Sequence, residues 1–133
     1  MKMFLAVVSI ALVGLSPAQA APADPVKEYA ELLHHGAFMC KVQQDTYDVA
    51  KRYQSATQNQ DRDKVMSCYQ EYSTQAKTGL PAALKAAKND AVRTALKNLY
   101  TDWAAYFGEF DRLSESRYEH SESALETELL IDN

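Results

Sequence analysis

Apolar residues recur every three or four positions along most of this chain, and runs that alternate apolar and polar residues are scarce. A spacing of three and four places apolar side chains on one side of an α-helix. The chain has few glycines and no run of β-branched residues that would predict strands. The pattern therefore predicts an all-α protein, a small four-helix-bundle-like domain of three long helices and a weaker C-terminal one.

The first predicted helix begins at Pro25. Asp24 is suited to cap it, because a carboxylate there accepts from free backbone N–H groups, and proline costs little at the first helical position. The apolar residues that follow are spaced by three, four and seven and form one buried stripe. They are Val26, Ala30, Leu33, Ala37, Cys40 and Tyr47.

A polar stretch, residues 53–61, separates this helix from a second one. Ser55 and Thr57 are each followed three residues later by glutamine, the spacing of a capping box, so either is suited to open the second helix. Gly79 predicts the end of that helix, and Pro81 predicts the restart of the chain as a third. The inward side of the second helix carries Val65, Cys68, Tyr69, Tyr72 and Ala76.

The third predicted helix runs from Pro81, with a nick at Asn89, and carries the heaviest apolar stripe of the chain, at intervals of four and three. That stripe is Val92, Leu96, Leu99, Trp103, Tyr106, Phe110 and Leu113. A serine- and glutamate-rich segment then predicts a fourth, weaker helix, opened at Ser116 or Ser123. Its buried side carries Tyr118, Leu125 and Leu129.

The chain has two cysteines, Cys40 and Cys68, and both fall on inward stripes. An even number of cysteines in an exported chain predicts a disulfide. In an antiparallel helix pair, residues equally far from the turn face each other, so this bond places the turn near Gln54. Closing a loop of 28 residues should stabilise the fold by about 3–4 kcal/mol in the chain-entropy model. The bond would also remove both thiols from metal binding and redox chemistry.

Residues 1–20 predict a secretory signal peptide. Lys2 gives a charged start, residues 4–15 are apolar, and residues 18–20 form a small-x-small cleavage site. The apolar run is too short to predict a membrane span, so no membrane insertion is expected. Residues 21–133 are then predicted to form a single helical domain, located in the periplasm or secreted from a bacterial cell.

Charge is distributed unevenly. Residues 24–98 carry 11 Lys and Arg against 9 Asp and Glu, whereas residues 99–133 carry 2 against 9. This balance argues against a nucleic-acid partner, which would require a basic face. The acidic end is interpreted either as a solvated helix face or as a docking surface for a partner with a basic surface.

Two sets of residues are candidates for partner binding. Tyr100 and Phe107 flank the third stripe and belong either to the edge of the core, which is favoured, or to a partly exposed aromatic anchor. The acidic candidates, at helical spacing, are Glu115, Glu119, Glu122 and Glu126.

Three apolar residues of the first helix, Phe38, Val42 and Val49, fall opposite its main stripe. They are expected to pack under the C-terminal segment, or otherwise against another molecule.

A metal site is a weaker alternative. Glu31, His35 and Met39 are spaced by four along one flank of the first helix and offer mixed ligands to copper. Only two of them are good copper donors, so no metal or other cofactor is predicted.

The sequence shows no catalytic motif such as a nucleophile elbow or a glycine-rich phosphate loop. The leading hypothesis is therefore a non-catalytic exported protein that binds another protein, for example to inhibit or neutralise a toxin or hydrolase of the envelope. The alternatives are a periplasmic carrier of a metal or small ligand, and a chaperone that protects against acid or stress.

Overall fold

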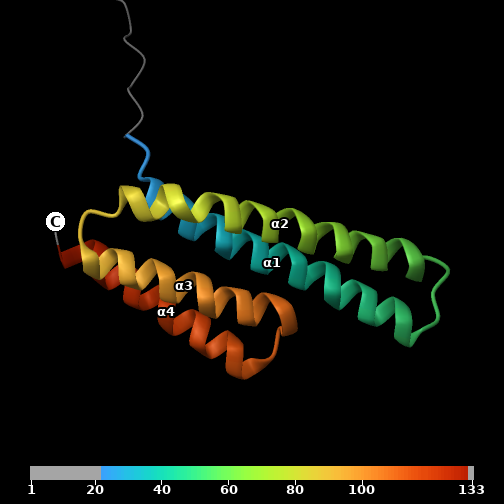
Figure 1. Cartoon of the computed structure of the whole chain (residues 1–133). Helices are drawn as coiled ribbons and strands as arrows, with labels where there is room; N and C mark the ends of the chain where they lie inside the picture. The colour runs from blue at the N-terminus through green and yellow to red at the C-terminus, as the bar shows by residue number, and fades with distance from the viewer. Residues whose placement is uncertain (1–21, 132–133) are drawn as a thin grey trace, which may run out of the picture.

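The computed structural model describes residues 22–131 as four α-helices. Figure 1 shows that they form two antiparallel hairpins lying side by side. The helices are α1 (Pro25–Arg52), α2 (Gln58–Ala86), α3 (Asp90–Glu109) and α4 (Arg112–Ile131). No strand occurs among the described residues, so the prediction of a small all-α bundle is confirmed. The predicted signal peptide lies outside the described residues.

Helix α1 begins as the sequence predicts. The Asp24 carboxylate accepts hydrogen bonds from the backbone N–H groups of Val26, at 3.0 Å, and Lys27, at 3.4 Å. Pro25 takes the first helical position, where its missing N–H would have had no partner within the helix.

The turn between α1 and α2 also lies where it is predicted, since Gln54 adopts a left-handed backbone with φ 51°. Of the two predicted starts of the second helix, Thr57 is confirmed and Ser55 is wrong, but no capping box forms at Thr57. The N-cap of α2 is Thr57, and its side chain makes no capping hydrogen bond. The Thr57 hydroxyl instead donates to the Asp61 carboxylate at 2.8 Å, and the Ser55 hydroxyl accepts from the Thr57 N–H within the turn.

The predicted end of α2 at Gly79 is wrong, because the helix continues through it. Gly79 has no positive φ and therefore lacks the left-handed conformation that ends many helices. Its missing side chain makes room for the ring of Tyr29, whose Cε2 would lie 3.2 Å from a Cβ built on Gly79. The Tyr29 hydroxyl donates to the Ala76 carbonyl at 2.7 Å and fixes this close approach.

Pro81 lies inside α2 and does not start a new helix. Proline removes one helical hydrogen bond, but the next turn carries Ala83 and Ala87, which are buried in the core. The helix instead ends before Asn89, where only a nick is predicted from the sequence. The Asn89 side chain accepts from the Val92 N–H at 2.8 Å and caps α3.

The boundary between α3 and α4 also differs from the prediction. Phe110 takes the left-handed conformation that ends α3, with φ 52°. Asp111 then caps α4 by accepting from the N–H groups of Leu113 and Ser114 at 2.9 and 3.0 Å. The fourth helix therefore opens neither at Ser116 nor at Ser123. Leu113, expected on the buried stripe, is 63% exposed because it belongs to the new helix.

Aromatic residues of α3 join the two hairpins. The Trp103 indole N–H donates to the Leu33 carbonyl of α1 at 2.7 Å. Phe107 contacts Tyr69 of α2 edge-on, with ring centroids 4.9 Å apart. Within the α3–α4 hairpin, Tyr106 stacks on Tyr118 of α4, with ring centroids 5.7 Å apart. Tyr118, Leu125 and Leu129 are buried as predicted.

The predicted disulfide is present: Cys40 and Cys68 are bonded, with Cα atoms 5.6 Å apart. The bond lies at the limit of the main hydrophobic core, because that core takes no residue between 40 and 68. Helices α1 and α2 have 28 and 29 residues, whereas α3 and α4 have 20 each. Residues 41–67 therefore project past the α3–α4 hairpin as an overhang of two helices (Figure 1).

Candidate functional site

The four acidic candidates lie along one side of α4. Their spacing of four, three and four residues keeps them within about a sixth of the helix circumference. The buried residues of α4 occupy the neighbouring side, so the acidic residues border the contact with the rest of the bundle. They are Glu115, Glu119, Glu122 and Glu126.

Part of this acidic side forms the wall of a groove between α1 and α4, with a volume of about 530 Å³. Its floor is apolar, and its rim carries three carboxylates against one lysine. We call it the acidic groove. The floor is built from Ala30, Leu99, Leu125 and Leu129, and the rim from Lys27, Glu31, His34, Glu122, Glu126 and Leu130.

Glu122 is the fixed carboxylate of the groove. It accepts a hydrogen bond from the Tyr118 hydroxyl at 2.6 Å and lies 3.0 Å from the Nδ1 atom of His34. Burial, together with Glu122, raises the pKa of Tyr118, so this hydroxyl keeps its proton. Glu31 and Glu126 are exposed on the two walls, one on each helix.

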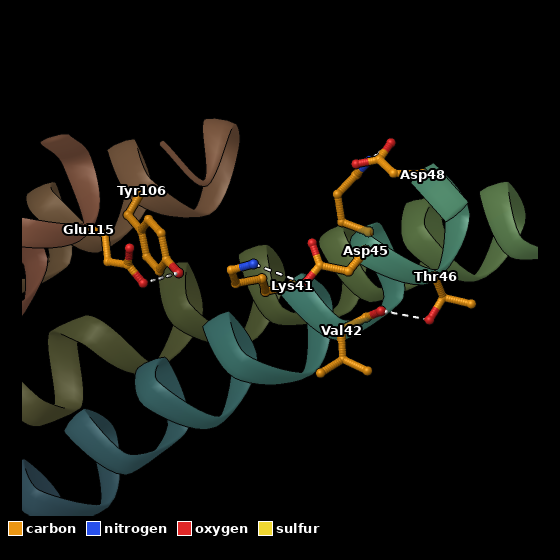
Figure 2. Close-up of polar contacts among 8 residues, drawn as sticks. Lys41, Val42, Asp45, Thr46, Asp48, Tyr106 and Glu115 are labelled. Carbon is orange, nitrogen blue, oxygen red and sulfur yellow. Dashed lines mark hydrogen bonds and ion pairs between the residues drawn. The ribbon is translucent and has the colours of Figure 1, made fainter. Parts of the chain in front are cut away.

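Glu115 and Glu119 lie nearer the α3–α4 turn and outside the groove. Glu115 accepts from the Tyr106 hydroxyl at 3.2 Å, as Figure 2 shows. Burial and then the charge of Glu115 raise the pKa of Tyr106 to about 12. Glu119 is exposed. The structure therefore brings two of the four acidic candidates into one site and leaves two beside it.

The aromatic candidates lie against the core. Phe107 is 3% exposed, stacked on Trp103 with ring centroids 4.3 Å apart and in edge contact with Tyr69 at 4.9 Å. Tyr100 is half-buried and also stacks on Trp103, with ring centroids 6.3 Å apart. Phe107 is therefore a core residue, the alternative favoured from the sequence, and offers no surface to a partner.

The three weak metal candidates do not converge. Glu31 lines the acidic groove, His35 packs its ring edge-on against Tyr72 at 5.9 Å, and Met39 lines a separate shallow hollow between α1 and α2. Within residues 22–131, no group of three or more His, Cys, Asp and Glu side chains is placed to hold a metal ion.

The expectation that Phe38, Val42 and Val49 pack under the C-terminal segment is wrong. All three are exposed, because α4 lies along the opposite end of α1, where Glu122 reaches His34. From Phe38 onward the outer side of α1 is left uncovered.

Sequence reasoning missed the groove as a site, although it singled out all three of its carboxylates, Glu122 and Glu126 for partner binding and Glu31 as a metal ligand. The floor residue Leu99 comes from α3, and Lys27 and His34 come from the first three turns of α1. The groove exists because α1 and α4 are separated along this edge, and no local pattern in either helix encodes that separation. The heptad spacing of Lys27 and His34 opposite an acidic helix was the available signal.

No family model matches the chain, and neither a curated protein nor a solved structure is found to be similar to it. In the described part of the chain, none of the helices combines the length and the apolar character needed to cross a bilayer. Fold and site together define a small disulfide-bonded helical protein with an acidic groove.

Proposed function

We propose that this protein binds another protein, without catalysis, by holding a cationic and partly apolar segment of it in the acidic groove. The observation that carries the proposal is an apolar floor between Glu31 on one wall and Glu122 and Glu126 on the other. The floor suits an apolar side chain or the methylene stem of a lysine or arginine, whose charged end reaches the carboxylates.

Electrostatics favour such a partner in two ways. The excess of acidic residues after residue 98 attracts a basic surface during diffusional encounter. Carboxylates on the groove walls then form charge-assisted hydrogen bonds with the bound segment. Binding of this kind weakens as salt screens the charges.

We place this activity outside the cytoplasm. The disulfide supports that placement, since such bonds persist in oxidising compartments, and the signal peptide predicted over residues 1–20 agrees with it. In this setting the protein would inhibit a partner by covering the partner's basic cleft. A toxin or hydrolase of the envelope is an example of such a partner.

Charge-neutral variants of the groove test the proposal. Wild type and Glu31→Gln/Glu126→Gln, both exposed positions, are immobilised and exposed to envelope extract. We expect the double variant to bind its captured partner about tenfold more weakly, because two charge-assisted contacts are lost. Glu71→Gln/Glu109→Gln removes the same charge away from the groove and should bind as wild type does. Equal capture by all three proteins would contradict the proposal.

A small amphipathic cation is a second candidate occupant, because about 530 Å³ falls within the range of small-ligand sites. Native mass spectrometry of protein purified without denaturation separates the two candidates. A retained small molecule that is lost from Glu31→Gln/Glu126→Gln favours carriage, whereas a bare mass favours the protein partner.

A further inference from the structure

Four exposed apolar residues form a continuous surface on the outer side of α1, which we call the outer stripe. They are Phe38, Val42, Val49 and Tyr53, with exposures of 61%, 44%, 52% and 75%. At 3.6 residues per turn they fall within about 60° of the helix circumference. This surface is separate from the acidic groove.

The polar residues within the stripe are satisfied by α1 itself. The Thr46 hydroxyl donates to the Val42 carbonyl at 2.8 Å, and Asp45 is paired with Lys41 at 2.9 Å. Figure 2 shows both contacts running along the helix. Covering the stripe would therefore leave the Thr46 hydroxyl bonded, which removes the main penalty for burying a polar group.

The order of residues in the stripe reads alike from both ends. Phe38 and Tyr53 are aromatic and equally far from a point between Asp45 and Thr46, and the valines at 42 and 49 are equally far from the same point. In an antiparallel pair of identical helices, a two-fold axis through this point would place each residue opposite its counterpart.

We propose that the outer stripe pairs with the outer stripe of a second copy of this chain, with the two α1 helices antiparallel. Val42 of each copy then faces Val49 of the other, and Phe38 faces Tyr53. The two Asp45 carboxylates meet beside the two-fold axis, and each is paired with Lys41 of its own helix at 2.9 Å, which offsets their repulsion. Lys41 and Asp48 are level with Ala50 and Gln43 of the other copy in the same register.

The overhang makes room for this pairing. The core that the α3–α4 hairpin covers takes α1 residues only from Val26 to Cys40. In the antiparallel register Phe38 of the second copy faces Tyr53 at the end of α1, so its residues 26–37 extend beyond the α1–α2 turn. Each α3–α4 hairpin therefore lies past the end of the other molecule's α1, whereas a parallel pair would bring the two hairpins against each other.

The contact is short, so the dimer should be weak. From Phe38 to Tyr53 the helix rises about 22 Å, and two such helices bury less than the roughly 1,200 Å² of a standard stable interface. Sedimentation velocity across roughly 1 μM to 1 mM, the range in which weak complexes form and dissociate, should show a shift from monomer to dimer. A monomer throughout that range would overturn the proposal.

Charge substitutions test the register. Val42→Lys and Val49→Glu should each raise the dissociation constant at least about tenfold, because each buries unpaired charges. The double variant Val42→Lys/Val49→Glu should recover much of the lost affinity at low salt, since the lysine of each copy faces the glutamate of the other. In a parallel pair the same double variant would oppose like charges and bind worst.

The matched control is Ile131→Lys, which charges an exposed apolar residue, 69% exposed, outside the stripe, and should dimerise as wild type does. Circular dichroism confirms that each variant is folded. Dimerisation unaffected by the two single substitutions, or a double variant weaker than both, would overturn the proposed seam. So would a stripe that is found occupied by a different protein while the chain itself stays monomeric.

Discussion

Two glycines inside helices differ in how closely side chains of other helices approach them. A Cβ on Gly36 of α1 would lie 2.6 Å and 2.8 Å from the Cδ1 and Cγ atoms of Tyr72 on α2, so the helices meet there through a bare backbone. A Cβ on Gly108 of α3 would meet nothing within 4 Å. One residue type therefore serves close packing at the first position and has no packing role at the second.

Alanine substitutions should consequently have opposite effects at these positions. Gly36→Ala should lower the free energy of unfolding by about 1–2 kcal/mol net, because overpacking against Tyr72 outweighs the gain in helix propensity. Gly108→Ala should raise it by about 0.5–1 kcal/mol, since only the propensity gain remains. Urea titrations of both variants measure this, and changes of the same sign would contradict the packing described.

Helix ends show which signals in the sequence can be trusted. Asp24-Pro25 is a local signal, and α1 starts there because the cap needs only its own neighbouring N–H groups. Gly79 and Pro81 are equally strong local signals, yet the helix passes through them because Tyr29 and the core hold the backbone in place. Contacts of Tyr29 with residues about 50 positions later in the sequence determine this boundary. No pattern within α2 reveals those contacts.

The break that does occur depends on Asn89. Asn89→Ala should lower the free energy of unfolding by about 1 kcal/mol, because the Val92 N–H loses its capping acceptor. Asn98→Ala makes the same chemical change at an exposed interior position of α3 and should be neutral or slightly stabilising. Thermal unfolding of the two variants distinguishes them, and equal effects would show that the cap does not hold the break.

At the scale of the whole molecule, the disulfide was predictable and the shape was not. Two cysteines on inward stripes were enough to predict the bond and the turn near Gln54. The overhang and the groove depend on the unequal lengths of the hairpins and on the separation of α1 from α4. Since the boundary near Pro81 was misplaced, the third helix was expected to be longer than it is, and the two hairpins could not be compared.

Loss of the disulfide should be costly for a chain of this size. Reduction, or Cys40→Ala/Cys68→Ala, should lower the free energy of unfolding by about 3–4 kcal/mol, because the unfolded chain regains the freedom of a 28-residue loop. Denaturant titrations with and without reductant measure the difference. The double-alanine variant should not respond to reductant, and a loss below about 1 kcal/mol would show that this bond is not a major source of stability.

The position of the Cys40–Cys68 bond at the base of the overhang has a consequence for proteolysis. A protease that cuts the backbone once anywhere from residue 41 to residue 67 releases no fragment, because the sulfur bridge still joins the two pieces. The clipped protein would keep its full mass, apart from one added water, until a thiol reagent separates the halves. A nicked population would thus run as intact material on a gel without reductant and split only when reductant is added.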